Sequence, residues 1–174
     1  MLTEDEILTE LRTYKTFAKA YREGKRKSEL PSIPQNKDSQ SSNAKLVIGI
    51  FLLPIISGFL SFAMTCRLKS LAVKLARLRV EADTFSLEPV SCGLNSAYTY
   101  LGLSLLAKND LQGAIDCLDT SWRVHPCPHN VSYGLKRRLV GRLKNCEEAK
   151  KVVEQYIKMG QHFSLWPENW AKGI

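Results

Sequence analysis

Residues 95–126 read NSAYTYLGLSLLAKNDLQGAIDCLDTSWRVHP, and this stretch decides the fold expected for the 174-residue chain. Small and apolar residues recur at helical spacing in two runs, which a turn at Asn109-Asp110 separates. The runs contain Tyr98, Leu101, Gly102 and Leu105 before the turn, and Ala114, Ile115 and Leu118 after it. Pro126 then ends the second run, because proline cannot continue a helix interior. The pattern predicts two helices joined by a short turn, and with it an all-α fold.

This pattern resembles the tetratricopeptide repeat, in which an aromatic residue precedes Leu-Gly and a large residue, and Ala, a large residue and Pro follow. Each matching position has a packing reason: Gly102 and Ala114 are small where antiparallel helices approach closely, and larger side chains fill the space around them. The resemblance assigns repeat packing to Tyr98, Leu101, Gly102, Leu105, Ala114, Leu118 and Pro126. The sequence departs from the family pattern at Asn109, where Gly is usual, and at Ser121, where Ala is usual.

A second, less regular unit follows the first. Its apolar residues are Tyr133, Leu135 and Leu139 in one helix, and Ala149, Val152, Val153, Tyr156 and Ile157 in the next. Asn145 and Glu148 indicate a capped start to that second helix, and Gly160 indicates its end. The spacing is about one residue off, and Lys136 occupies the small-residue position. The sequence therefore predicts TPR-like repeats over residues 86–160, one clear and one degenerate.

Two flanking segments are expected to complete this short array. Repeat units bury their apolar faces against neighbours, and about three units are usually needed for independent stability. The basic helix expected at residues 67–85 and the aromatic tail at residues 161–174 are candidates for the missing neighbours. The tail contains Phe163, Trp166 and Trp170. Three roles are open for these side chains: sealing the last helix, occupying the groove of the repeats, or touching a membrane interface.

Residues 46–66, LVIGIFLLPIISGFLSFAMTC, contain no charged side chain. As an α-helix this segment would span roughly 31 Å, close to the roughly 30 Å of a bilayer's hydrocarbon core. Lys45 and Arg67 bracket it, and Pro54 predicts a kink, which membrane helices tolerate. The segment predicts a single transmembrane helix, with a buried hairpin or core helix as the alternative. More Lys and Arg residues lie within about 15 residues after it than before it, so the C-terminal part is expected in the cytosol.

The regions on either side of this segment are predicted more simply. Residues 1–24 form an amphipathic helix, which Thr3 and Glu6 begin as a capping box, and which either docks on the rest of the protein or lies on a membrane. Residues 25–45 form a flexible linker. Leucines on one face of the 67–85 helix predict packing against the following domain, while its basic residues suggest contact with anionic lipid.

Composition argues against several classes of function. The net charge is +8, but the basic residues are scattered and match no nucleic-acid-binding motif. Five cysteines without a Cys-x-x-Cys pair indicate reduced thiols. His125, Cys127 and His129 alternate in a proline-containing turn whose spacing does not match a zinc site. Because no phosphate-binding loop or catalytic grouping is present either, neither an enzyme, a metal site nor a cofactor is expected.

The resemblance also implies a binding surface, because proteins of this class hold a partner in a concave groove lined by the first helix of each pair. The residues carried over to that groove are Thr99, Leu103, Leu106, Tyr133, Arg137 and Val140. Such an apolar lining with one cation suits a helix or an apolar peptide segment of a protein partner. The expected function is a membrane-anchored adaptor or assembly factor of the endoplasmic reticulum or a mitochondrial membrane. A structural subunit of a larger membrane complex and a basic lipid-surface-binding protein are the alternatives.

Overall fold

The computed structural model describes residues 3–22, 52–85, 91–124, 126, 134–165 and 167–172. Within these ranges every regular element is a helix, so the all-α fold class is confirmed there. The elements are α1 (Glu4–Arg22), α3 (Leu53–Thr65), α4 (Lys69–Phe85), α5 (Ser91–Ala107), α6 (Leu111–Ser121), α8 (Arg138–Leu143), the 3-10 turn η3 (Glu147–Ala149), α9 (Lys150–Phe163) and α10 (Pro167–Ala171). The predicted linker at 25–45 and the turn carrying His125, Cys127 and His129 lie outside the described residues.

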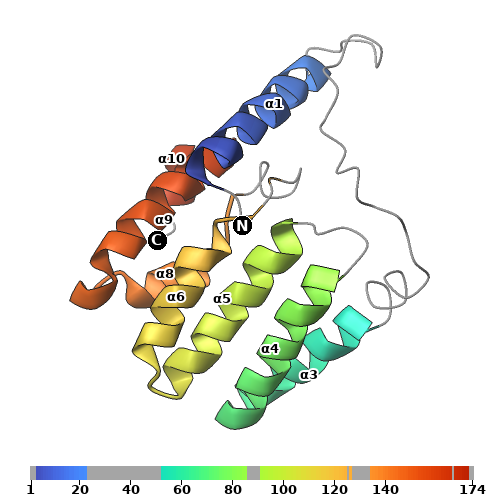
Figure 1. The fold of residues 1–174 in the computed structure, drawn as a ribbon, viewed down its shortest axis with the longest axis vertical. Helices are drawn as coiled ribbons and strands as arrows, with labels where there is room; N and C mark the ends of the chain where they lie inside the picture. Colours follow the sequence, from blue (N-terminus) through green and yellow to red (C-terminus); the bar gives the residue numbers. More distant parts are fainter. Residues whose placement is uncertain are drawn as a thin grey trace.

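Helices that follow one another in the sequence pack side by side (Figure 1). Helix α3 packs on α4, α4 on α5, and α5 on α6, and α8 and α9 continue the row at the α6 side. The described chain thus forms three helix pairs, α3–α4, α5–α6 and α8–α9, an arrangement compatible with a helical-repeat fold. Helices α1 and α10 lie against α9 at the far end of the row.

Two of the tight turns rest on residues with a left-handed backbone. Asn109, between α5 and α6, has φ 63°, a conformation that asparagine tolerates better than most residues. Asp110 then caps α6, because its carboxylate accepts a hydrogen bond of 2.9 Å from the Gly113 N–H. Arg67, between α3 and α4, has φ 57°. These turns reverse the chain within a few residues and so place successive helices in contact.

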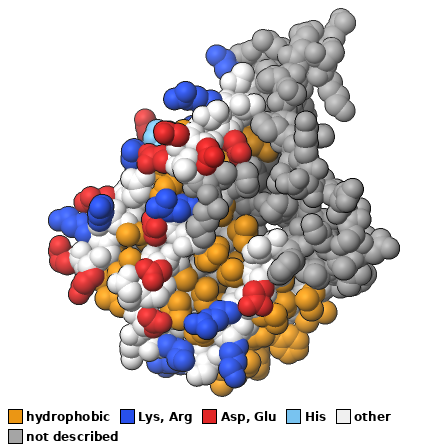
Figure 2. Space-filling model, in the orientation of Figure 1, with side chains coloured by type: hydrophobic (Ala, Val, Ile, Leu, Met, Phe, Trp, Pro, Cys, Tyr) orange, Lys and Arg blue, Asp and Glu red, His pale blue; other side chains and the backbone are white. Residues whose placement is uncertain are grey.

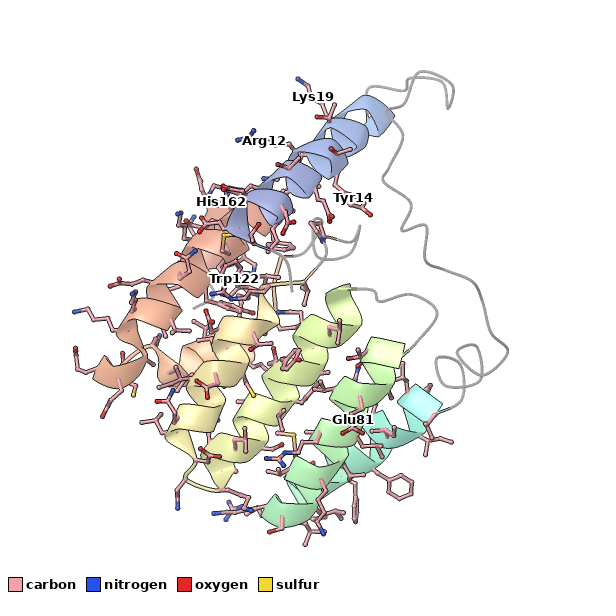
Figure 3. All side chains as sticks on the ribbon, in the orientation of Figure 1. Arg12, Tyr14, Lys19, Glu81, Trp122 and His162 are labelled. Carbon is pink, nitrogen blue, oxygen red and sulfur yellow. The ribbon has the colours of Figure 1, made fainter. Side chains whose placement is uncertain are left out.

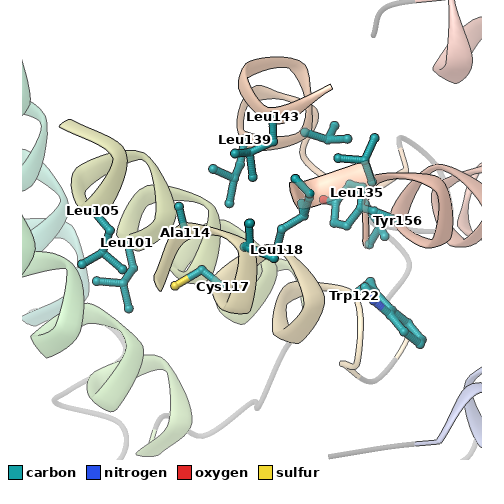
Figure 4. Close-up of a cluster of buried hydrophobic side chains, with 14 of the residues drawn as sticks. Leu101, Leu105, Ala114, Cys117, Leu118, Trp122, Leu135, Leu139, Leu143 and Tyr156 are labelled. Atoms are coloured by element: carbon teal, nitrogen blue, oxygen red, sulfur yellow. The ribbon is translucent and has the colours of Figure 1, made fainter. Parts of the chain in front are cut away.

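The interior is closely packed where α5, α6 and α8 meet. A Cβ atom built on Gly102 would lie 2.4 Å from a Leu139 methyl carbon of α8 and 3.2 Å from the Cys117 Cβ of α6. Ala114, Leu118 and Leu139 around it are completely buried (Figure 4). Burial also raises the pKa of the Cys117 thiol to about 11, so the thiol stays protonated at neutral pH. A side chain larger than hydrogen at position 102 would displace the Leu139 side chain and press on Cys117.

A buried polar network joins α5 to α6, α9 and the segment before α8. The Asn95 amide donates to the Ser121 carbonyl oxygen at 2.8 Å, and its side-chain oxygen accepts from the Lys136 N–H at 2.9 Å. The Tyr156 hydroxyl donates to the Lys136 carbonyl oxygen at 2.7 Å and lies 3.3 Å from the Asn95 amide nitrogen. Burial raises the pKa of Tyr156 to about 12. The network fixes the relative position of the two downstream helix pairs.

Helix α1 docks on the molecule through α9. Thr3 and Glu6 form the predicted capping box, with the Thr3 N–H donating to the Glu6 carboxylate at 2.8 Å. Ile7 and Leu11 are buried, and Lys158 of α9 donates to the Glu4 carboxylate at 3.0 Å, which lowers the pKa of Glu4. Figure 3 shows the exposed side chains of Arg12 and Lys19 pointing away from the remaining helices. Of the two roles considered for this helix, the structure therefore displays docking.

The C-terminal aromatic residues belong to the interior. Trp170 of α10 fills a slot beside Gly134 and Gly160, and its indole N–H donates to the Leu135 carbonyl oxygen at 2.8 Å. Phe163 is fully buried at the end of α9. These two side chains seal the last helix pair, the first of the three roles that the sequence left open. Trp166 lies outside the described residues.

Candidate functional site

Helix α3 is apolar on two sides, and only one of them is covered. Ile56, Leu60 and Ala63 are spaced by one helical turn and are buried. Ile55, Phe59 and Phe62 have similar spacing on another side and are 54–61% exposed. Because an exposed phenylalanine is costly in water, three large side chains on one helix face indicate a surface that contacts something apolar.

Helix α4 turns its small residues inward and two of its three leucines outward, whereas Leu75 packs partly buried against the core. Ala72, Val73 and Ala76 are buried, whereas Leu71 and Leu78 are each 44% exposed. The prediction that a leucine face packs on the following domain is therefore wrong for these two residues. The physical reason is distance: alanine side chains let α4 approach α5 closely, and a leucine face would hold the helices further apart.

These residues form one surface, which we call the α3–α4 apolar face. Its members are the large hydrophobic residues that are 40–61% exposed: Leu52, Ile55, Phe59, Phe62, Leu68, Leu71 and Leu78. Figure 2 shows hydrophobic side chains gathered over the part of the molecule where Figure 1 places α3 and α4. In the described chain, all strongly exposed large hydrophobic residues lie on this hairpin. The concentration on a single edge of the array distinguishes it from scattered exposure.

A polar clamp holds the two helices of the hairpin in place. The Arg79 guanidinium of α4 donates to the Ser57 hydroxyl oxygen of α3 at 2.6 Å and pairs with Asp83 at 3.2 Å. It also lies 5.8 Å from the centre of the Tyr100 ring of α5, within cation–π range. Asp83 fits against α5 because Gly93 has no side chain there. One arginine thus connects three successive helices and keeps the outer sides of α3 and α4 together.

Burial raises the pKa of Asp83, and Arg79 opposes this only in part. A raised folded-state pKa means that the folded protein binds this proton more tightly than the unfolded chain does. The resulting stabilisation is complete below the ordinary aspartate pKa of about 4 and is lost as pH rises through the raised value.

We therefore expect Asp83→Asn, which cannot titrate, to gain stability relative to the wild type as pH rises from about 4 towards about 7. Urea unfolding of both proteins across this range gives the difference in free energy of unfolding at each pH. All other titrating groups are shared, so their contributions largely cancel. A difference that stays constant, or that falls with rising pH, would contradict the assignment.

The edge of the apolar face carries positive charge. Arg67, in the turn between α3 and α4, and Lys69, the first residue of α4, are exposed on either side of Leu68. Lys74 is exposed on α4 and lies one helical turn from both Leu71 and Leu78. The face is therefore an apolar surface interspersed with cations.

The six residues predicted to line a groove do not form one open surface. Thr99 is 3% exposed and its hydroxyl donates to the Asn95 carbonyl oxygen, and Val140 is fully buried. Leu103 and Leu106 are partly buried against the core. Arg137 is exposed and donates to the Trp170 carbonyl oxygen at 3.1 Å. Tyr133 lies outside the described residues.

The repeat-packing residues do come together. Leu101, Gly102, Leu105, Ala114 and Leu118 are buried between α5 and its neighbours, and Tyr98 packs partly buried against the same core. Pro126 is buried as well. This set was predicted from the repeat resemblance. The α3–α4 apolar face was missed because the inner and outer residues of both helices repeat with the same period.

The predicted membrane helix is only partly described. Residues 46–51 lie outside the described residues, and α3 accounts for most of the rest. Pro54, predicted to kink a longer helix, instead lies in the first turn of α3, where its missing N–H costs nothing. Among the described helices, none has both the length and the apolar character needed to cross a bilayer. Nor do three or more potential metal-ligating side chains gather anywhere in the described ranges.

Comparison with known proteins adds no assignment to this geometry. The chain matches no protein-family model, no curated protein and no solved structure.

Proposed function

We propose that the protein is a membrane-attached helical-repeat adaptor whose α3–α4 hairpin lies on the bilayer and whose remaining helices face the aqueous side. The observation that carries this proposal is the α3–α4 apolar face, with seven large apolar side chains 40–61% exposed. An amphipathic surface of this kind buries its apolar side chains at the boundary between headgroups and acyl chains. The uncharged residues 46–51 directly precede the hairpin in the sequence and extend its apolar character.

Membrane attachment through one face is a different arrangement from the single spanning helix that residues 46–66 suggested. It is supported by the turn at Cys66 and Arg67, which returns the chain along α3 as α4. It is supported too by the clamp of Arg79 on Ser57, which holds both apolar sides on one edge of the array. The endoplasmic reticulum or a mitochondrial membrane, with the helical array in the cytosol, remains the proposed location.

The adaptor part of the proposal rests on the row of helix pairs, since arrays of this kind offer extended surfaces to protein partners. A helix or apolar segment of another protein remains the proposed partner. With Thr99 and Val140 in the interior, the partly exposed Leu103 and Leu106 of α5 are the remaining apolar members of the predicted groove. Attachment to a membrane raises the local concentration of such a partner, so modest affinity suffices.

The membrane proposal predicts that Phe59→Glu/Phe62→Glu weakens binding to phosphatidylcholine vesicles. The two rings are about 60% exposed, and transferring that area into lipid is worth about 2 kcal/mol, or about 30-fold in partitioning. The full chain, diluted from detergent, is mixed with vesicles and floated on a sucrose gradient. The bound fraction measured over a series of lipid concentrations gives the partition coefficient.

The matched control is Asn145→Glu/Gln161→Glu, which adds the same charge at exposed positions away from the hairpin. This variant should float as the wild type does, and circular dichroism should show both variants folded. Equal flotation of the phenylalanine variant and the wild type would show that the α3–α4 apolar face does not bind the membrane. The wild type could instead fail to float, while Phe59→Glu/Phe62→Glu lowers its mass in size-exclusion chromatography. That result would show that a protein, and not lipid, covers the face.

A further inference from the structure

Three cations lie among the leucines of the α3–α4 apolar face rather than at a distance from it. Arg67 and Lys69 flank Leu68, and Lys74 lies between Leu71 and Leu78 along α4. All three are exposed, and none pairs with a carboxylate in the described parts of the chain. They differ in this respect from Arg79, which is held by Asp83 and Ser57 inside the hairpin.

This placement decides what the cations meet when the face enters a membrane. Lysine and arginine lay their aliphatic stems along apolar surface and keep their charged ends in the polar layer. With Leu68, Leu71 and Leu78 in the acyl boundary, the three charged ends reach the depth of the lipid phosphates. The exposed acid of the same helix, Glu81, lies about two helical turns beyond Lys74 and one turn beyond Leu78, at the far end of the face from Arg67 and Lys69.

The positive charge of the face also favours an anionic membrane over a second copy of the chain as the surface that covers it. In a symmetric dimer a second copy would bring a second set of the same three cations to the interface, and the surplus of like charge there would oppose association. An anionic membrane surface offers the opposite sign over an extended area, together with an apolar layer beneath it. Both features of the face are matched by such a surface.

We infer that the α3–α4 apolar face selects membranes that contain anionic lipid, with Arg67, Lys69 and Lys74 contacting headgroup phosphates. This inference rests on the proposed membrane attachment and adds the lipid class to it. Each cation near an anionic surface contributes about a five-fold gain in binding, so three contribute about 100-fold.

The test compares vesicles of phosphatidylcholine alone with vesicles that also contain phosphatidylglycerol, using the full chain and the flotation assay. The wild type should bind the anionic vesicles about 100-fold more tightly, and Lys69→Gln/Lys74→Gln should reduce that preference to about five-fold. Binding of this variant to phosphatidylcholine alone should match the wild type. Lys150→Gln/Lys151→Gln on α9 removes the same net charge from exposed positions outside the hairpin and should retain the full preference.

Different outcomes would overturn the anionic-lipid selection and the membrane attachment. Equal binding of the wild type to both kinds of vesicle overturns the anionic selection while membrane attachment stands. A preference lost equally in both lysine variants assigns it to net charge and overturns the role of Lys69 and Lys74. Failure of the wild type to float with either vesicle overturns membrane attachment itself.

Discussion

Trp170→Ala is expected to lower the free energy of unfolding by about 3–5 kcal/mol, the usual cost of deleting a large buried aromatic side chain. Trp170 is 3% exposed and lies 6.3 Å from the Tyr156 ring, measured between ring centres. Its loss leaves a cavity between α9 and the turn at Gly134, and leaves the Leu135 carbonyl oxygen without its indole donor. Urea unfolding followed by circular dichroism measures the change.

The slot around Trp170 gives this prediction a stringent second test. A Cβ atom on Gly160 would lie 2.0 Å from the indole, so Gly160→Ala should displace Trp170 and destabilise the protein by about 2–3 kcal/mol. In a Trp170→Ala background the clash is gone, and Gly160→Ala should then be neutral or slightly stabilising because alanine favours helix. The two substitutions should therefore be strongly non-additive. Additive effects would show that Gly160 and Trp170 do not share a slot.

The structural role of Gly160 could not be predicted from the sequence. A glycine after a periodic apolar run indicates the end of a helix, and that was the interpretation of the sequence at this position. In the structure α9 continues to Phe163, because Gly160 serves a partner ten residues further along the chain instead of ending a helix. The requirement for a small residue is tertiary, so no local pattern contains it.

The α5–α6 hairpin was predictable for the opposite reason. Its turn and its cap are local: Asn109 adopts the left-handed backbone, and Asp110 caps the helix. Gly102 faces both the adjacent α6 and the more distant Leu139 of α8. The orientation of α3 and α4 was not predictable in this way. Alanines and leucines of α4 both repeat with helical period, and which set turns inward depends on how closely α5 approaches. The predicted groove failed at Thr99 and Val140 because the neighbouring helices cover those positions.

Asn95→Ala is the second substitution with a large expected effect, about 3–4 kcal/mol of lost stability. Asn95 is completely buried and bonds to Ser121, Lys136 and Tyr156, which come from three separate parts of the array. Its removal leaves the buried Ser121 carbonyl oxygen and the part-buried Lys136 N–H without their side-chain partner, at about 1–3 kcal/mol for each group that stays unsatisfied.

Thr99→Val provides the matched control for Asn95→Ala, because it also removes a buried polar group from α5. The Thr99 hydroxyl bonds within its own helix, to the Asn95 carbonyl oxygen at 2.7 Å, so its loss should cost less than about 1 kcal/mol. Tyr156→Phe should cost about 1–2 kcal/mol and should couple to Asn95→Ala, because both side chains hold Lys136. Equal midpoints for Asn95→Ala and Thr99→Val would mean that contacts along α5, and not the network across helices, set the stability of the array. Apolar packing alone would then hold the α5–α6 and α8–α9 pairs together.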